Sequence, residues 1–208
     1  MIIAIDGPSG AGKSTVARLI SKELGFEYID TGAMYRALAY KAYKNNIDIN
    51  EEEIAKMLSV TNVDYFDNKI FLDGENVEGP IRDEIISKAA SKISAIKIVR
   101  EKMVELQRKI AVGKNIVMDG RDIGTKVFPN ADYKFFITAS LEERARRRFE
   151  QLDDKGKSYE SILSDMKKRD ENDSTRQFSP LKKAPDAILI DTTYMKIVDV
   201  VNSIVNIV

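Results

Sequence analysis

The sequence predicts an α/β fold in which a parallel β-sheet is covered by helices on both faces. Two observations carry this prediction. Five short apolar runs have the length and the composition of buried strands, and patterns typical of amphipathic helices alternate with them along the chain. Apolar residues make up 43% of the 208 positions, which is enough for a sizeable core. Alternating strands and helices indicate a parallel sheet, because helices make its crossover connections.

Each predicted strand is a short apolar run that ends close to turn-forming residues. The five strands are predicted at 2–5, 26–29, 116–118, 133–137 and 187–190. Each predicted helix repeats apolar residues at intervals of three or four. The helices are predicted at 16–24, 33–43, 51–59, 81–91, 95–112, 141–152, 159–171 and 197–205. Gly25 stands where a glycine commonly ends a helix, which supports the end of the first one.

The segment 60–80 departs from this alternation. Two β-favouring runs, 63–66 and 70–72, flank a turn at Asp67-Asn68, and Asp73-Gly74 supplies a second turn. Short strands joined by tight turns are typical of antiparallel pairing. We therefore expect a small antiparallel β-insert here.

The composition excludes several classes of chemistry. There is no Cys and no His, which excludes thiol nucleophiles, disulfides, histidine bases and thiolate or imidazole metal sites. The 33 basic residues are balanced by 33 acidic residues, so we expect neither nucleic acid nor an anionic membrane as a partner. No apolar run approaches the roughly 20 residues of a spanning helix, and the first residues are not typical of a signal peptide. We expect a soluble cytoplasmic protein.

Residues 7–14 read G-P-S-G-A-G-K-S, which is the P-loop pattern. Such a loop wraps backbone N–H groups around phosphate, and the following helix directs the positive end of its dipole at the same anion. A glycine-rich loop with a lysine also occurs by chance, but here an apolar strand precedes it and an amphipathic helix follows. The predicted ATP-binding residues are Gly7, Pro8, Ser9, Gly10, Ala11, Gly12, Lys13, Ser14 and Thr15.

Two oxygen-bearing residues are candidate ligands for Mg²⁺. The Ser14 hydroxyl follows the P-loop lysine, and Asp119 ends an apolar strand at the position typical of a Walker-B aspartate. The alternative for Asp119 is a turn or capping residue at a strand end. The P-loop favours the metal-binding interpretation.

The positions of the arginines indicate a second anion-binding site, in addition to the P-loop. Arg36 follows the run D-T-G-A-M-Y at 30–35, and Arg121 follows Asp119-Gly120. Arg169 and Arg176 fall in a polar segment, and four arginines crowd residues 144–148. Guanidinium groups bind phosphate through two parallel hydrogen bonds. The positions of these arginines therefore favour a function in phosphoryl transfer to a phosphorylated acceptor. The helical arginines could instead form a solvated face paired with neighbouring glutamates. An arginine-rich lid would need a hinge, for which Gly156 and the surrounding polar residues are candidates: Asp153, Asp154, Lys155 and Lys157.

Five sequence blocks together resemble the bacterial cytidylate kinases, which are P-loop nucleoside monophosphate kinases acting on CMP and dCMP. The blocks are I-D-G-P-S-G-A-G-K-S at 5–14, D-T-G-A-M-Y-R at 30–36, D-G-R-D-I-G-T at 119–125, S-L-E-E-R-A-R-R-R at 140–148, and K-K-R-D at 167–170 with the following Asp173 and Arg176. The resemblance covers essentially the whole chain. It implies a P-loop NTPase-type five-stranded parallel sheet, an acceptor-binding (NMP-binding) insertion with a small antiparallel β-segment, and a short arginine-rich lid.

The resemblance also implies how this single kinase unit, 1–208, is organised. The core would comprise 1–30, 113–140 and 177–208, the acceptor-binding region 31–112, and the lid with its adjoining helices 141–176. ATP and Mg²⁺ would serve as donor and cofactor, and CMP and dCMP as acceptors. We expect a monomer.

Roles for single residues follow from the resemblance, block by block. Lys13, Arg121, Arg144 and Arg148 would be catalytic. Arg36 and Arg121 would hold the acceptor phosphate with Thr31 and Arg176 nearby, Arg169 and Asp173 would contact the ribose, and Ser91, Arg100 and Asp122 would face the cytosine. A carboxylate such as Asp122 suits cytosine, because it accepts a hydrogen bond from the amino group where uracil offers only a carbonyl. Without the resemblance, Ser91 and Arg100 would be ordinary helix-surface residues.

Two other functions remain open from the sequence. The chain could be another small P-loop kinase, for UMP, AMP or a small metabolite. It could also be a nucleotide-binding switch with no small acceptor, although such a switch has no need of a second anion site. A substrate panel separates these alternatives.

Overall fold

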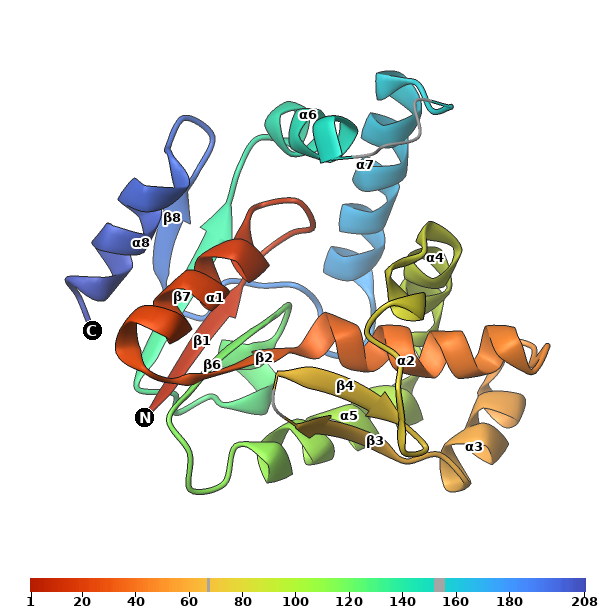
Figure 1. Cartoon of the computed structure of the whole chain (residues 1–208). Coiled ribbons are helices and arrows are strands. Elements are labelled where there is room, and N and C mark those ends of the chain that lie inside the picture. Colours follow the sequence, from red (N-terminus) through yellow and green to blue (C-terminus); the bar gives the residue numbers. More distant parts are fainter. Residues whose placement is uncertain (67, 152–155) are drawn as a thin grey trace. The chain divides into compact units, whose positions relative to one another are not determined.

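The computed structural model describes residues 1–66, 68–151 and 156–208. The chain forms two compact units (Figure 1). The first unit comprises Met1–Tyr28 and Lys114–Val208, and the second comprises Ile29–Gly113. No helix in the described ranges is long and apolar enough to cross a membrane.

A five-stranded sheet forms the framework of the first unit. Its order is β2-β6-β1-β7-β8, so β1 is the central strand. The strands are β1 (Ile2–Asp6), β2 (Glu27–Asp30), β6 (Ile116–Gly120), β7 (Tyr133–Thr138) and β8 (Ile188–Asp191). β1 runs parallel to β6 and β7, and β7 runs parallel to β8. The predicted five-stranded parallel sheet is confirmed.

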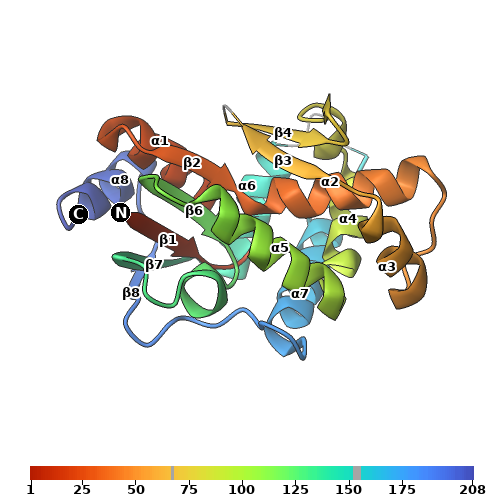
Figure 2. The same ribbon diagram turned by 90° about the horizontal axis from the view of Figure 1, so that it is seen from below.

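Two helices of the first unit lie side by side against this sheet. They are α1 (Lys13–Leu24) and α8 (Ile197–Val205), which contact each other (Figure 2). Ile20 of α1 and Ile204 of α8 are buried with Ile5 and Phe135 of the strands in one apolar core. Burying such side chains stabilises the fold by roughly 1.5–3 kcal/mol for each large one. Gly25 ends α1 in the left-handed conformation, as predicted.

Two further helices of the first unit are α6 (Leu141–Gln151) and α7 (Tyr159–Thr175). They pack together through a small apolar cluster of Ala145, Ile162 and Met166. Helix α7 runs four residues further than the predicted 159–171. The last residue of the predicted helix 141–152 and the predicted hinge residues 153–155 lie outside the described part of the chain.

A turn of π-helix, η2 (Ile123–Val127), follows β6 and was not predicted. Its apolar residues are too few for a periodic pattern. π-Helical turns are uncommon and often lie at functional sites. This one directly follows Asp122 and contains the last three residues of the D-G-R-D-I-G-T block.

Among its described residues, the second unit contains four α-helices and a small antiparallel sheet. The helices are α2 (Thr31–Lys44), α3 (Glu51–Ser59), α4 (Glu84–Ile93) and α5 (Lys97–Ile110). The sheet consists of β3 (Val63–Phe66), β4 (Lys69–Leu72) and β5 (Glu75–Asn76). Both of its pairings are antiparallel, which confirms the predicted insert and adds β5 as a third strand. Of the predicted turn between β3 and β4, Asp67 lies outside the described residues.

Capping residues explain where two helices of this unit begin. Helix α2 starts two residues before the predicted Ala33, because the Asp30 side chain accepts a hydrogen bond from the Ala33 N–H. The predicted helix 81–91 begins later, at Glu84. Pro80–Arg82 instead form a turn of 3₁₀-helix, η1, and Asp83 caps α4 by accepting from the Ile85 N–H.

Candidate active site

The P-loop connects β1 to α1 at the carboxyl end of the central strand. Gly7 has a φ of 146° and Gly12 a φ of 90°, both in a region that other residues rarely adopt. A Cβ on Gly7 would lie 1.9 Å from the carbonyl oxygen of Ile137, so only glycine fits there. Gly12 immediately precedes α1. The loop therefore has the backbone that a phosphate cradle requires.

Lys13 is the first residue of α1 and is buried, with 5% of its surface exposed. Its Nζ donates a hydrogen bond of 2.6 Å to the Pro8 carbonyl, so the side chain curls back over the loop. Burial, followed by repulsion from Arg121, lowers the pKa of Lys13 to about 7. A phosphate anion beside the ammonium group would raise this pKa again.

Ser14 and Asp119 come together although they are distant in sequence. The Ser14 hydroxyl donates a hydrogen bond of 2.8 Å to Oδ2 of Asp119, and the Tyr28 hydroxyl donates one of 2.8 Å to Oδ1. Mg²⁺ prefers oxygen ligands and is commonly held by one or two protein oxygens together with substrate phosphates. This pair fits such an ion. Among the described residues there is no group of three or more acidic, His or Cys side chains that could hold a metal without substrate.

Three arginines surround the buried carboxylate of Asp173 in the first unit. Arg121 Nε donates a hydrogen bond of 3.0 Å to one carboxylate oxygen, and Arg176 lies 3.5 Å from the other. Burial alone would raise the pKa of Asp173, but the charges of Arg121, Arg169 and Arg176 lower it. We call these four residues the arginine cluster. Guanidinium groups gathered in this way suit a phosphate, which they can bind in bidentate fashion.

The arginine cluster and the P-loop are electrostatically linked. Both Arg121 and Arg169 contribute to the lowered pKa of Lys13. These positive charges repel one another, and the carboxylates of Asp119 and Asp6 offset part of that effect on Lys13. Negatively charged phosphates would relieve this repulsion. Asp122, next to Arg121, is also buried, with 4% of its surface exposed.

The crowded arginines of α6 have different surroundings. Arg144 is buried and donates hydrogen bonds to the Ala139 carbonyl, the Ser9 carbonyl and the Asp170 carboxylate. It therefore ties a P-loop carbonyl to α7. Its catalytic role remains a prediction.

Of the other three arginines of α6, two pair with glutamates and, among the described residues, one does not. Arg146 is exposed and pairs with Glu143 and Glu150, as expected for a solvated face. Arg147 pairs with Glu143 and donates to the Thr192 carbonyl. Arg148 is half-buried and has no ion-pair partner in the part of the chain that the structure describes. The crowding alone does not require a bound anion, since carboxylates already pair with the first three arginines.

The remaining predicted acceptor-binding residues lie in the second unit. Thr31 is the buried first residue of α2, and Arg36, one turn further, forms a 2.9 Å ion pair with Asp30. Arg100 of α5 is buried and donates a hydrogen bond to the Ser94 carbonyl. The Ser94 hydroxyl in turn donates to the carbonyl of Ser91, on α4. Ser94 therefore links the predicted residues Ser91 and Arg100, whereas Thr31 and Arg36 lie on one helix, α2.

Four residues of the first unit support the site but were given no role from the sequence, although two of them stand in the quoted blocks. They are Asp6, Tyr28, Asp170 and Thr192, and each is the distant partner of a predicted residue or of its neighbours. The signal for Asp6 is an acidic residue that ends an otherwise apolar strand. The signal for Tyr28 is weaker, because an aromatic residue is ordinary in a strand.

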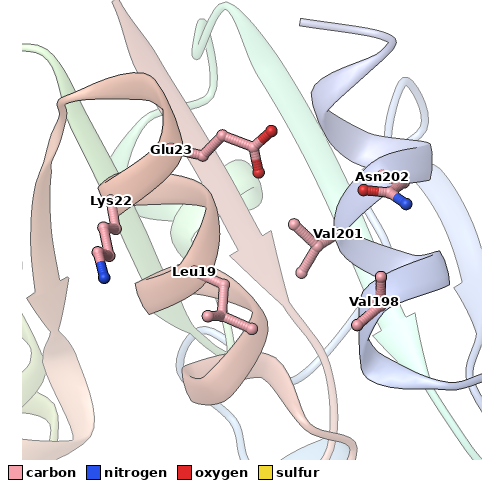
Figure 3. Close-up of a pocket in the computed structure, with 6 residues that line it drawn as sticks. All are labelled: Leu19, Lys22, Glu23, Val198, Val201 and Asn202. Atoms are coloured by element: carbon pink, nitrogen blue, oxygen red, sulfur yellow. The ribbon is translucent and has the colours of Figure 1, made fainter.

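A shallow, mainly apolar groove between α1 and α8 is separate from these residues. Its α1 residues come from the second half of that helix, whereas the phosphate cradle precedes the helix. The groove is lined by Leu19, Lys22, Glu23, Val198, Val201 and Asn202 (Figure 3). It takes no part in the candidate active site.

The chain is similar to known proteins over its whole length. The family model described as cytidylate kinase matches residues 3–208. A cytidylate kinase of Caldanaerobacter subterraneus subsp. tengcongensis is 57% identical over 194 residues, covering 92% of this chain and 87% of the relative. One of Clostridioides difficile is 48% identical over 209 residues, covering 99% and 97%.

Among solved structures, a gluconokinase from Sinorhizobium meliloti matches with a TM-score of 0.51 at 14% identity, covering 98% of this chain and 89% of the gluconokinase. At that identity the likeness supports the fold alone. The family match and the two relatives, by contrast, agree in sequence over nearly the whole chain. The chain belongs to the cytidylate kinase family.

Proposed function

We propose that this chain transfers the γ-phosphoryl group of ATP to CMP and dCMP, giving ADP with CDP or dCDP. One observation carries this proposal beyond family membership. In the first unit the Lys13 ammonium group lies over the P-loop, 2.6 Å from the Pro8 carbonyl, and the arginine cluster holds Arg121 and Arg176 against the Asp173 carboxylate. Two phosphorylated ligands would neutralise both groups.

The proposed reaction needs no histidine or cysteine. An oxygen of the CMP phosphate attacks the γ-phosphorus of ATP, and the bond from that phosphorus to the β–γ bridging oxygen breaks. The electron pair stays on ADP. The second pKa of a phosphate monoester is about 6, so the attacking phosphate is already largely ionised at neutral pH. The protein must mainly position the two phosphates and neutralise their charge.

The donor side of the proposed site is the P-loop, 7–15. Its N–H groups and the Lys13 ammonium would hold the outer phosphates of ATP. Ser14 and Asp119 would hold Mg²⁺, which neutralises charge on the donor phosphates. Buried Lys13 and the Ser14–Asp119 hydrogen bond support these roles.

The acceptor side of the proposed site in the first unit is the arginine cluster with Asp122. Arg121 and Arg176 would bind the CMP phosphate, and Arg169 and Asp173 would contact the ribose. Asp122 would accept a hydrogen bond from the cytosine amino group. With UMP, two acceptors would face each other, a mismatch of roughly 1–3 kcal/mol. Roles for Thr31, Arg36, Ser91 and Arg100 in the second unit remain predictions from their sequence blocks.

Two arginines of α6 would complete the catalytic set. We propose that Arg148 supplies charge to the transferring phosphoryl group, because it is half-buried and has no ion-pair partner among the described residues. Arg144 would act on the same reaction through the Ser9 carbonyl that it holds, at 3.1 Å.

An assay of ADP release tests the proposal. Purified protein, ATP and Mg²⁺ are combined with CMP, dCMP, UMP or AMP, or with no acceptor. We expect strong stimulation by CMP and dCMP and weak stimulation by UMP. Strongest stimulation by UMP or AMP would indicate a different monophosphate kinase. ATP hydrolysis that no monophosphate changes would indicate a nucleotide-binding switch.

A further inference from the structure

We propose that Asp6 is a positioning residue for the acceptor site, where its carboxylate fixes the turn that carries Arg121 and Asp122. This inference rests on the proposed function, because it concerns recognition of CMP. Asp6 is the last residue of β1, directly before the P-loop. It has no assigned part in holding ATP or Mg²⁺.

The Asp6 carboxylate makes two hydrogen bonds to the turn after β6. Oδ1 accepts from the Ile123 N–H at 2.8 Å, and Oδ2 accepts from the Gly124 N–H at 2.7 Å. The side chain is buried, with 4% of the residue exposed. A hydrogen bond to an ionised group is roughly twice as strong as a neutral one, so this contact holds the turn firmly.

These bonds replace a local helix cap. The first N–H groups of a helix have no partner within the helix, and the residue before it usually supplies one from its own side chain. That residue is Asp122 for the turn η2, and within the described part of the chain its side chain makes no capping bond. Asp6 supplies the acceptors from the neighbouring strand. The cap therefore does not consume the Asp122 carboxylate that we assign to cytosine.

A buried carboxylate at this position carries an energetic cost. Burial raises the pKa of Asp6 to about 6, and the negative charge of Asp122 adds to the effect. The two N–H groups and Lys13 act in the opposite direction. An apolar residue would fit the end of a buried strand without this cost. The two hydrogen bonds give a reason for a carboxylate at this position, because they set the position of the acceptor-binding turn.

The variant Asp6→Asn tests this role. The amide keeps one acceptor oxygen but turns an NH₂ group toward the second backbone N–H, so one bond is lost. We expect the KM for CMP to rise about tenfold, the value that corresponds to one lost charge-assisted hydrogen bond. The kcat/KM ratio of CMP over UMP should also fall, because Asp122 is then held less firmly against the cytosine. The KM for ATP should change less than about threefold, since the P-loop backbone is untouched.

Asp132→Asn is the matched control. This carboxylate also accepts a hydrogen bond from β1, from the Ile2 N–H at 2.6 Å, but at the opposite end of the strand. The control should leave both KM values and the CMP/UMP ratio unchanged. If Asp6→Asn weakens CMP and ATP equally and leaves the base preference unchanged, Asp6 only stabilises the P-loop strand and the inference is wrong.

A second variant, Gly124→Ala, tests the positioning role of Asp6 if Asp6→Asn does not fold. In Gly124→Ala the new Cβ would lie 3.5 Å from Asp6 Oδ2 and 3.2 Å from Lys134 Cδ, so it crowds the same contact from the side of the turn. We expect a smaller loss of the same kind, in CMP affinity and base preference. Unchanged values would overturn the inference. Wild-type protein that does not phosphorylate CMP would instead refute the proposed function.

Discussion

Ser14 and Asp119 lie 105 residues apart in the sequence and are joined by a hydrogen bond of 2.8 Å. The second oxygen of the same carboxylate accepts a hydrogen bond from Tyr28. The carboxylate is therefore fixed from two sides, by the residue after the P-loop lysine and by the strand β2. Groups behind a metal ligand commonly tune its affinity for the ion.

The hydrogen bond from Tyr28 should strengthen the binding of Mg²⁺ by Asp119. Tyr28→Phe removes the hydroxyl that orients Asp119 and leaves the ring in place. Loss of such a supporting bond typically weakens metal binding by about 10- to 100-fold. We expect the Mg²⁺ concentration for half-maximal rate to rise about tenfold, with little change in the KM for CMP. The measurement is initial rate against free Mg²⁺ at saturating nucleotides.

Tyr133→Phe is the control for this substitution. Tyr133 also lies in a strand of the first unit, and its hydroxyl donates to the Val208 carbonyl. That variant should keep the wild-type Mg²⁺ dependence. Equal Mg²⁺ requirements for Tyr28→Phe and the wild type would show that Tyr28 does not support a metal ligand.

Removing the P-loop ammonium should abolish most of the turnover without unfolding the protein. In Lys13→Ala the cost of burying the ammonium group and its repulsion from Arg121 disappear together with its attraction to Asp119, so we expect unfolding in urea to be nearly unchanged. Loss of one preorganised charge at a reacting group costs roughly 10²- to 10³-fold in rate. We expect a fall in kcat of that order. A variant with more than half of the wild-type kcat would contradict the assigned role.

A pair of substitutions in α6 separates a catalytic arginine from a solvated one. Arg148→Ala should lower kcat by roughly 10²-fold, as expected for loss of a transition-state charge. Arg146→Ala is the matched control, because Arg146 is exposed and already paired with two glutamates. Exposed pairs contribute little, so its kcat should stay within about twofold. Equal effects of the two substitutions would remove Arg148 from the catalytic set.

Asp6 should give the stability of the protein a distinct pH dependence. Its pKa is raised from the ordinary 3.8 to about 6, so the folded state binds the proton more tightly than the unfolded state. This contribution is fully present below pH 3.8 and is lost as the pH rises through about 6. Asp6→Asn cannot titrate. We expect the stability advantage of wild type over Asp6→Asn to shrink by an amount on the order of 2–3 kcal/mol from about pH 4 to pH 7.

Urea unfolding of both proteins across this range provides the measurement. Other titrating groups are common to the two proteins and cancel in the difference. A stability difference that stays constant with pH would show that Asp6 keeps an ordinary pKa.

Local sequence signals predicted the strands and the P-loop well. The strand β1 and the cradle are encoded within 14 consecutive residues, so periodicity and glycine spacing suffice. The turn η2 was missed because its cap, Asp6, comes from 117 residues earlier in the chain. Helix α4 was placed too early because Ile81, which continues the helical pattern, lies in a turn of 3₁₀-helix.

The partners of the arginines could not be read from the sequence either. The pairing of Arg146 with nearby glutamates follows from helical spacing and was weighed as an alternative. The partner of Arg144, however, is Asp170, which lies on another helix. Pairing of that kind depends on how α6 and α7 pack. The arginine cluster around Asp173 likewise joins Arg121 to a segment 52 residues away.

The proposed reaction requires two nucleotide sites in one molecule, one for the donor and one for the acceptor. Calorimetric titration of CMP into protein saturated with a non-hydrolysable ATP analogue and Mg²⁺ tests this directly. We expect one CMP to bind per chain while the analogue remains bound, with affinity reduced in Arg121→Ala. Displacement of the analogue by CMP, or no binding of CMP at all, would contradict the account.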